Sequence, residues 1–225
     1  MQNHILTTQE LFAPGHTRAW AHLSGYEYPW EILAEIKDII REVGATLPPD
    51  EYDHPAEDIW IARSARIAPT AYIGAPAIIG ADTEVRHDAF IRGAALVGDG
   101  CVVGNSVELK NCILFDGVQV SHYNYVGDSV LGYKAHMGAG AVTSNVKSDR
   151  TLVSVRAGDE VLETRLKKMG AILGDRVEVG GNSVLNPGTV IGADSNIYPL
   201  SSVRGTVPPR CILKSGKGTE IVEKQ

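Results

Sequence analysis

Aliphatic residues recur at every sixth position over the first half of the chain. The unbroken series is Ile61, Ile67, Ile73, Ile79, Val85, Ile91, Val97, Val103 and Leu109. Most of these anchors are followed, four residues later, by a small or modest side chain: Ala65, Ala71, Ala77, Thr83, Ala89, Ala95, Cys101 and Val107. In a parallel β-helix each hexad forms one flat side of a prism, and the anchors of successive coils pack on one another. The pattern therefore predicts an all-β fold, a parallel β-helix of hexapeptide repeats.

The repeat continues beyond Leu109 with two shortened steps. Five-residue steps separate Leu109 from Leu114 and Val126 from Leu131, and both keep the number of coils unchanged. The later anchors are Leu114, Val120, Val126, Leu131, Met137, Thr143, Leu173, Val179, Leu185, Ile191, Ile197 and Val203. With three hexads per coil, residues 18 apart stack at roughly the 4.8 Å spacing of paired strands. This tally predicts about seven coils, and periodicity alone leaves the handedness of the coil open.

Three regions depart from the repeat. Residues 1–58 are expected to form a helical N-terminal cap and a linker, because apolar residues follow helical spacing from Trp30 to Val43 and Gly44 stands at the C-cap. We expect this helix to cover the open end of the β-helix, where strand edges are unpaired; a partner-binding or oligomerising segment is the alternative. The β-helix occupies 59–207, with a charged insertion at about 144–172 that is either a solvated loop or a phosphate-contacting arm. Residues 208–225 are expected to be a polar tail.

Composition narrows the class of protein. The formal net charge of -6 and the pI near 5.6 argue against a nucleic-acid partner, which usually meets a basic face. No apolar run approaches the roughly 18 residues of a membrane span, and no basic segment precedes an apolar stretch at the start. We therefore expect a soluble cytoplasmic protein without a membrane partner. Cys101 occupies an inward position, and three cysteines without a C-x-x-C pair do not indicate a disulfide framework.

The hexad register places polar side chains in columns that meet at one corner. The columns are His87, Asn105 and His122; Arg92 and Lys110; and Glu108 and Tyr125. An imidazole is suited to accept the proton that an amine loses when it attacks a carbonyl. An Arg–Lys pair forms a positive clamp for phosphate, and Glu108 is placed to orient the imidazole or the substrate amine. The corner therefore predicts acylation of an amine on a phosphorylated substrate.

Three sequence blocks between Gly104 and Asn145 carry a family resemblance. The blocks V-E-x-K, H-x-x-Y-x-G-D and G-A-G-x-x-T-x-N occur here in this order. The segment resembles the acetyltransferase domain of bacterial bifunctional UDP-N-acetylglucosamine pyrophosphorylase/glucosamine-1-phosphate acetyltransferases. It is more similar to the archaeal bifunctional sugar-1-phosphate nucleotidylyltransferase/acetyltransferases, and weaker matches extend from Ile73 to Val207. The resemblance implies a left-handed β-helix, a homotrimer with sites shared between subunits, and acetyl-CoA-dependent N-acetylation of an amino-sugar 1-phosphate in nucleotide-sugar biosynthesis.

The resemblance also assigns roles to residues. It implies that His122 is the general base and that no metal is needed. The residues that it implies contact the sugar or its phosphate are Arg92, Lys110, Glu108, Tyr125 and Asn145. His136 stands where the bacterial domain has an asparagine that contacts the sugar, and we expect it to contact the substrate as well. Ala139 matches a position whose backbone contacts acetyl-CoA, and Gly181 and Pro199 stand where the family has other small residues that help to hold it. Glucosamine 1-phosphate is the first candidate acceptor, with galactosamine 1-phosphate or a nucleotide-linked amino sugar as alternatives. The chain has no room for the nucleotidyltransferase half, so we expect no pyrophosphorylase activity from it alone, and a separate nucleotidyltransferase chain is a candidate partner.

Two other functions stay open at this point. A γ-type carbonic anhydrase holds zinc with three histidines across a trimer interface, and His87, His122 and His136 suggest that comparison. However, His87 and His122 are two coils apart, roughly 9–10 Å, too far to share one metal within a subunit. The second alternative is a trimeric scaffold that binds a sugar phosphate or nucleotide sugar and has lost catalysis. Affinity for acetyl-CoA separates such a scaffold from a transferase.

Overall fold

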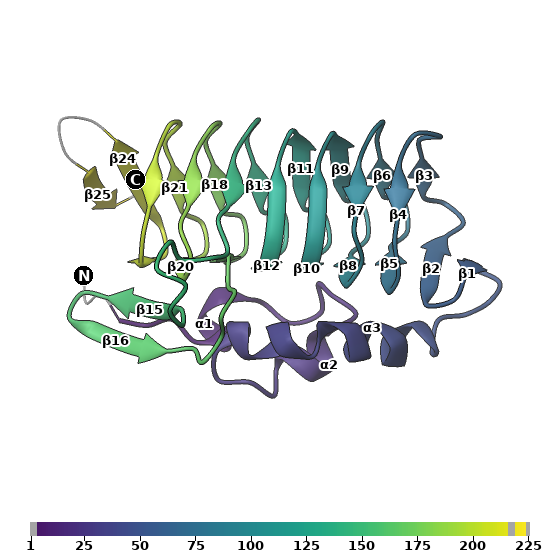
Figure 1. Ribbon diagram of the computed structural model, residues 1–225, viewed down its shortest axis with the longest axis horizontal. Helices are drawn as coiled ribbons and strands as arrows, with labels where there is room; N and C mark the ends of the chain where they lie inside the picture. Colours follow the sequence, from purple (N-terminus) through teal and green to yellow (C-terminus); the bar gives the residue numbers. More distant parts are fainter. Residues whose placement is uncertain (1–3, 216–218, 224–225) are drawn as a thin grey trace.

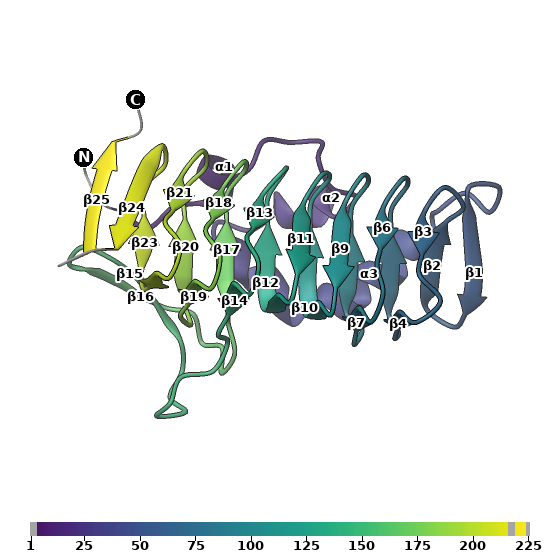
Figure 2. The same cartoon turned by 90° about the horizontal axis from the view of Figure 1, so that it is seen from above.

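The stacked coils predicted by the hexads form a three-sided prism, seen from two sides in Figures 1 and 2. The computed structural model describes residues 4–215 and 219–223. Anchors one coil apart are paired, as Ile73 with Ile91 and Ile91 with Leu109, and their side chains fill the interior. The all-β, left-handed parallel β-helix is therefore confirmed, together with a small helical N-terminal appendage.

Each face of the prism is a column of parallel strands. Face one contains β2 (Ile59–Ala62), β5 (Ala77–Ile79), β8 (Ala95–Val97), β17 (Ala171–Leu173), β20 (Thr189–Ile191) and β23 (Thr206–Val207). Face two contains β3 (Arg66–Ile67), β6 (Glu84–Val85), β9 (Val102–Asn105), β11 (Gln119–His122), β13 (His136–Met137), β18 (Glu178–Val179), β21 (Asn196–Ile197) and β24 (Cys211–Ser215). Face three contains β4 (Tyr72–Ile73), β7 (Phe90–Ile91), β14 (Val142–Thr143), β19 (Val184–Leu185) and β22 (Ser202–Val203). The long strands β10 (Glu108–Leu114) and β12 (Tyr125–Leu131) pass from face three onto face one.

Many corners of the prism are turned by residues with left-handed backbone. Asn111 has φ 50°, Tyr123 φ 52° and Asp128 φ 48°. This conformation costs most L-residues about 1–2 kcal/mol, and Asn and Asp tolerate it best. Burial of the aliphatic anchors offsets that cost, and Asn and Asp side chains are thereby fixed at corners where they face outward.

The N-terminal helices lie along face one and not over the end of the prism. They are α1 (Thr8–Leu11), α2 (Trp20–Leu23), the 3₁₀ helix η1 (Pro29–Ala34) and α3 (Ile36–Gly44), shown below the coils in Figure 1. α3 packs on β5, β8 and β10, and η1 packs on β12. The expected single helix from Trp30 to Val43 is thus divided at Glu35. Gly44 is the last residue of α3 and Ala45 is its C-cap, and the position requires glycine because a Cβ would come within 2.5 Å of the Trp60 ring. We call residues 4–47 the N-terminal strap; within the described chain, no helix is long and apolar enough to cross a membrane.

The expected end cap was wrong because the apolar surface that needs cover lies elsewhere. Face one carries apolar side chains on its outer surface as well as inside: Ile78, Leu96, Ile113, Val130, Ile172 and Val190, all fully buried. The first strand edge is already paired, since β1 (Tyr52–Ala56) runs antiparallel to β2. Packing on face one therefore stabilises the fold more than packing over the end of the prism would. Each aliphatic side chain removed from water on face one contributes about 1.5–3 kcal/mol of folding free energy.

The insertion and the C-terminal segment are also more ordered than expected. The insertion contains a hairpin of β15 (Ser154–Ala157) and β16 (Glu160–Glu163), and β15 packs on β20 and β23 with Val153 and Val155 buried. The hairpin thus extends the cover of face one and is not a freely solvated loop. The segment expected to be a polar tail continues face two as β24, and β25 (Thr219–Glu223) pairs antiparallel with it. Both ends of the prism therefore finish on an antiparallel strand.

A ladder of aspartates holds the strap at the corner between faces one and two. Arg18 donates to both carboxylate oxygens of Asp99, at 2.8 and 3.0 Å. Asp175 accepts the backbone N–H of Ala13 at 2.8 Å. Asp116 accepts the N–H of Asp99 at 2.8 Å, and burial raises the pKa of Asp116. The strap is thus attached to the coils by hydrogen bonds as well as by apolar packing.

The raised pKa of Asp116 predicts a pH-dependent stability difference. The folded state binds this proton more tightly than the unfolded state, so the contribution of Asp116 to stability is fully present below the ordinary Asp pKa and is lost as pH rises through the raised pKa. Asp116→Asn keeps an acceptor for the Asp99 N–H and removes the ionisation. In urea unfolding from pH 3 to pH 7, the free energy of unfolding of the variant should rise relative to that of the parent as pH rises. A stability difference that does not change with pH would contradict the assignment.

Candidate active site

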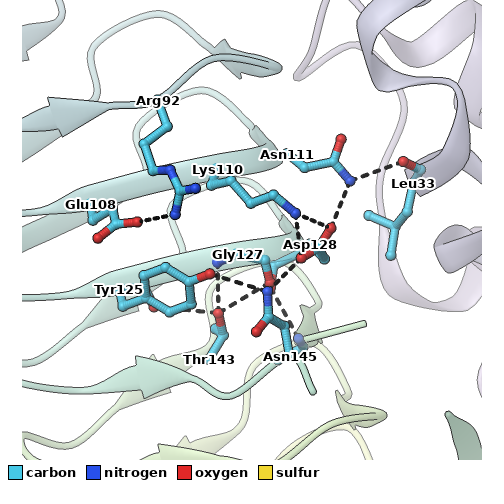
Figure 3. Close-up of polar contacts among 12 residues, drawn as sticks. Leu33, Arg92, Glu108, Lys110, Asn111, Tyr125, Gly127, Asp128, Thr143 and Asn145 are labelled. Atoms are coloured by element: carbon cyan, nitrogen blue, oxygen red, sulfur yellow. Dashed lines mark hydrogen bonds and ion pairs between the residues drawn. The ribbon is translucent and has the colours of Figure 1, made fainter. Parts of the chain in front are cut away.

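Five of the six predicted substrate residues lie together on face three and its corner with face one, as Figure 3 shows: Arg92, Glu108, Lys110, Tyr125 and Asn145. Arg92 and Lys110 follow the paired anchors Ile91 and Leu109 and are therefore neighbours across one coil step. The Arg92 guanidinium donates to Glu108 Oε1 at 2.8 Å, and the Lys110 ammonium donates to both oxygens of Asp128 at 2.9 and 3.0 Å. The predicted Arg–Lys pair is formed, and each cation carries its own carboxylate.

Asp128 is the centre of the polar network at this site. Its side chain is 5% exposed, and it accepts hydrogen bonds from Lys110, Asn111 and Asn145 (Figure 3). A buried carboxylate is tolerable only when its oxygens are satisfied in this way. Sequence reasoning missed Asp128 and Asn111 as site residues, although Asp128 is the final letter of the H-x-x-Y-x-G-D block.

Tyr125 and Asn145 join the same network. The Asn145 amide donates to the Tyr125 hydroxyl oxygen at 3.1 Å. Burial, and then the charge of Asp128, raise the pKa of Tyr125, so its hydroxyl stays protonated at neutral pH. Because Asn145 uses an oxygen lone pair, the phenolic proton remains available for a substrate oxygen.

Arg92 and Lys110 line a pocket of about 270 Å³ beside this network. Asn111 lines it from the neighbouring corner, and Lys37 lines it from α3 of the strap. Sequence reasoning did not find Lys37, because no motif connects the N-terminal helix with residues more than fifty positions later.

His122 lies at the opposite edge of face three, at the end of β11. The predicted column is formed: Asn105 is paired with His122, and the Asn105 amide donates to the His87 carbonyl at 3.2 Å. The His122 side chain is exposed, and among the described residues its ring has no hydrogen-bond or ionic partner. The imidazole is therefore accessible to a bound substrate.

The positions expected to hold acetyl-CoA continue the column of His122. Gly140 N–H donates to the His122 carbonyl, Asn182 N–H to that of Ala139, and Leu200 N–H to that of Gly181. This ladder sets the order His122, Ala139, Gly181, Pro199 along one corner, over about 14 Å at the strand spacing. Gly181 and Pro199 border a groove of about 980 Å³ on face two. Because Gly181 has no side chain and that of Ala139 is small, this corner is open to a ligand.

His136 is not brought together with the other predicted substrate residues within one chain. It precedes the inward anchor Met137, so its side chain points out of face two into the groove beside Gly181 and Pro199. Its Nδ1 lies 2.7 Å from Glu178 Oε2. The structure thus places His136 with the residues expected to hold acetyl-CoA.

A second polar pocket of about 460 Å³ lies where the insertion leaves face three. Lys147, Arg156 and Arg204 line it together with Asp149. Lys147 donates to Thr151 Oγ1 at 2.6 Å, within the insertion itself. In a single chain this pocket is separate from the one lined by Arg92 and Lys110.

The histidines do not form a metal site in one chain. His87 and His122 are two coils apart in their column, and His136 lies on face two. Among residues 4–215 and 219–223, no group of three His, Cys, Asp or Glu side chains is arranged to hold a metal ion.

Comparison with known proteins covers most of the candidate site, from Arg92 to Gly181, and leaves Lys37 and Pro199 outside the matched range. A family model described as the GMPPB C-terminal domain matches residues 75–195. The bifunctional sugar-1-phosphate nucleotidylyltransferase/acetyltransferase of Sulfurisphaera tokodaii is 35% identical over 102 residues, which cover 45% of this chain and 25% of that protein. The bifunctional protein GlmU of Methanococcus maripaludis strain C5 is 35% identical over 92 residues, which cover 41% of this chain and 22% of that protein.

These relatives are of the kind that the three sequence blocks predicted, and that resemblance is confirmed. The chain spans only about a quarter of the length of the curated relatives it matches. Among solved structures, the acetyltransferase domain of PglB from Neisseria gonorrhoeae in complex with acetyl coenzyme A aligns with 14% identity and a TM-score of 0.36, over 85% of this chain and 67% of that chain.

Proposed function

The chain belongs to the family of the GMPPB C-terminal domain, and from this premise we propose that it transfers the acetyl group of acetyl-CoA to the amine of an amino-sugar 1-phosphate. The observation that carries the proposal is the continuous line from His122 through Ala139 and Gly181 to Pro199 along one edge of face three, with the pocket lined by Arg92 and Lys110 at the opposite edge of the same face. A thioester lying along this corner brings its carbonyl near His122. Glucosamine 1-phosphate is the proposed acceptor, and the proposed setting is nucleotide-sugar biosynthesis in the cytoplasm, with a separate chain supplying nucleotidyl transfer.

The chemistry needs one base, one oxyanion donor and a clamp. The neutral amine attacks the thioester carbonyl, a C–N bond forms, and the C–S bond then breaks. His122 accepts the proton of the amine and returns it to the departing thiolate, so the products are the amide and the free thiol of CoA. The Ala139 N–H, which has no acceptor among the described residues, is a candidate donor to the oxyanion.

A thiol-release assay with acetyl-CoA and a panel of amino-sugar phosphates tests the proposal directly. Turnover with one of these acceptors and none with acetyl-CoA alone is expected. Binding of the sugar phosphates without affinity for acetyl-CoA would instead identify the catalytically silent scaffold.

Removing the base should lower turnover selectively. His122→Ala should lower kcat by about 10²- to 10⁴-fold, the usual contribution of a general base, while affinity for acetyl-CoA is retained. The loss should shrink as pH rises, because more acceptor amine is then neutral. His87→Ala is the matched control, since His87 occupies the same column two coils away and should be silent. Near-parental kcat for His122→Ala at neutral pH would exclude His122 as the base, and His136 would be tested next.

Weakening the phosphate clamp should raise the acceptor KM. Lys110→Ala is expected to raise it by about 10- to 100-fold, the range for losing a charge-assisted hydrogen bond, with little change in KM for acetyl-CoA. Because Lys110 also supports the buried Asp128, Arg92→Gln is the companion variant: Arg92 is exposed and pairs with the part-exposed Glu108. Activity on unphosphorylated amino sugars is expected to be poor in the parent, and both variants should leave it unchanged. Equal parental turnover of phosphorylated and unphosphorylated acceptors would remove the clamp from the mechanism.

We further propose that the chain is a homotrimer with shared sites. In one chain the candidate site is an open surface, and Tyr72 and Phe90 are exposed aromatic side chains on the same face three. A neighbouring chain packed on this face would bury them and close the site.

Sedimentation at micromolar concentration should therefore report a trimer, and Phe90→Glu should dissociate it and abolish turnover. Val161→Glu is the control, because Val161 is 45% exposed against 44% for Phe90 but lies on the hairpin of the insertion. A stable, active monomer would contradict the shared site.

A further inference from the structure

We propose that the N-terminal strap is part of the acceptor site and that Lys37 is its third phosphate-binding cation. This inference rests on the proposed function and adds a residue from outside the region of family similarity, which begins at residue 75. Lys37 lies in α3 and lines the same pocket of about 270 Å³ as Arg92 and Lys110.

The charges at the pocket show why a third cation matters. Arg92 is paired with Glu108 at 2.8 Å, and Lys110 is paired with Asp128 at 2.9 Å, so these two cations are already balanced by two carboxylates. Lys37 has no ionic partner within the described chain. Of the three cations that line the pocket, Lys37 is therefore the one without a carboxylate partner among the described residues.

Within the described residues, no neighbour on α3 forms an ion pair with Lys37. Asp38 pairs with Arg41 at 3.1 Å, and Arg41 also bonds Asp58 at 2.7 Å. A phosphate monoester carries about 1.5 to 2 negative charges near pH 7, so it gains from a lining cation that no carboxylate already balances.

The strap is held in place where it meets the site. Asn111 donates to the Leu33 carbonyl at 3.0 Å and to Asp128 at 3.0 Å, so one amide ties the strap to the centre of the network (Figure 3). Ile36 and Ile40, on either side of Lys37 in α3, are fully buried against the coils. The backbone of Lys37 is thereby fixed, while its exposed ammonium stays on a flexible stem that can reach a ligand.

The test is calorimetric titration of the full chain with glucosamine 1-phosphate, glucose 1-phosphate and glucosamine at low ionic strength. Lys37→Gln should lower the affinity for both sugar phosphates by about tenfold, as expected for one partly screened charge-assisted contact. The affinity for glucosamine should not change. Lys37→Arg keeps the charge and should stay within about twofold of the parent. Lys134→Gln is the matched control, since Lys134 is an exposed lysine that does not line the pocket.

The outcomes separate this inference from the proposed function. If Lys37→Gln and the parent bound the sugar phosphates with equal affinity, the role of Lys37 would be overturned. The same would follow if Lys134→Gln lowered that affinity as much as Lys37→Gln does. Binding requires no acetyl transfer, so a tenfold loss in Lys37→Gln without thiol release by the parent would support the role of Lys37 and overturn the transferase. In an active parent, Lys37→Gln should raise the acceptor KM and leave kcat unchanged.

Discussion

The apolar outer surface of face one is the constraint on which the arrangement of the remaining chain depends. An ordinary hexad needs one inward anchor, yet the strands of face one also turn Ile78, Leu96 and Ile113 outward. Exposure of such a column would cost about 1.5–3 kcal/mol for each side chain. The strap and the insertion hairpin both fold back onto this face, and their positions follow from that demand (Figure 1).

The N-terminal strap, which covers face one, also contributes residues to the candidate site. Because η1 and α3 lie against β10 and β12, Leu33 reaches Asn111 and Lys37 reaches the pocket of Arg92. A packing requirement on one face thus supplies polar groups to the corner beside it. In this arrangement the strap is both structural cover and a wall of the candidate site.

Asp128 lies at the centre of the polar network that joins the strap to the candidate site. Its carboxylate is almost fully buried, and it orders Lys110, Asn111 and Asn145 around itself. A satisfied buried network of this kind is rigid, and loss of one member leaves a costly unpaired charge. The amine chemistry is proposed for the opposite edge of face three, where His122 is exposed and its ring has no partner in the described residues. The proposed binding groups are therefore preorganised, while the proposed base stays accessible.

The sequence by itself determined the coils and the columns. A six-residue period can bury its anchors only by stacking, so the neighbours of Ile91, Asn105 and His122 followed from counting. The position of the strap did not follow, because a helix that shows one apolar face can pack on any apolar surface. The informative signal was the run of three apolar residues in strands such as Ala77–Ile79, which leaves one of them facing outward. Lys37, the separation of His136 from Tyr125 and the central role of Asp128 were decided by tertiary structure, because each depends on which faces of the prism meet and not on the spacing along the chain.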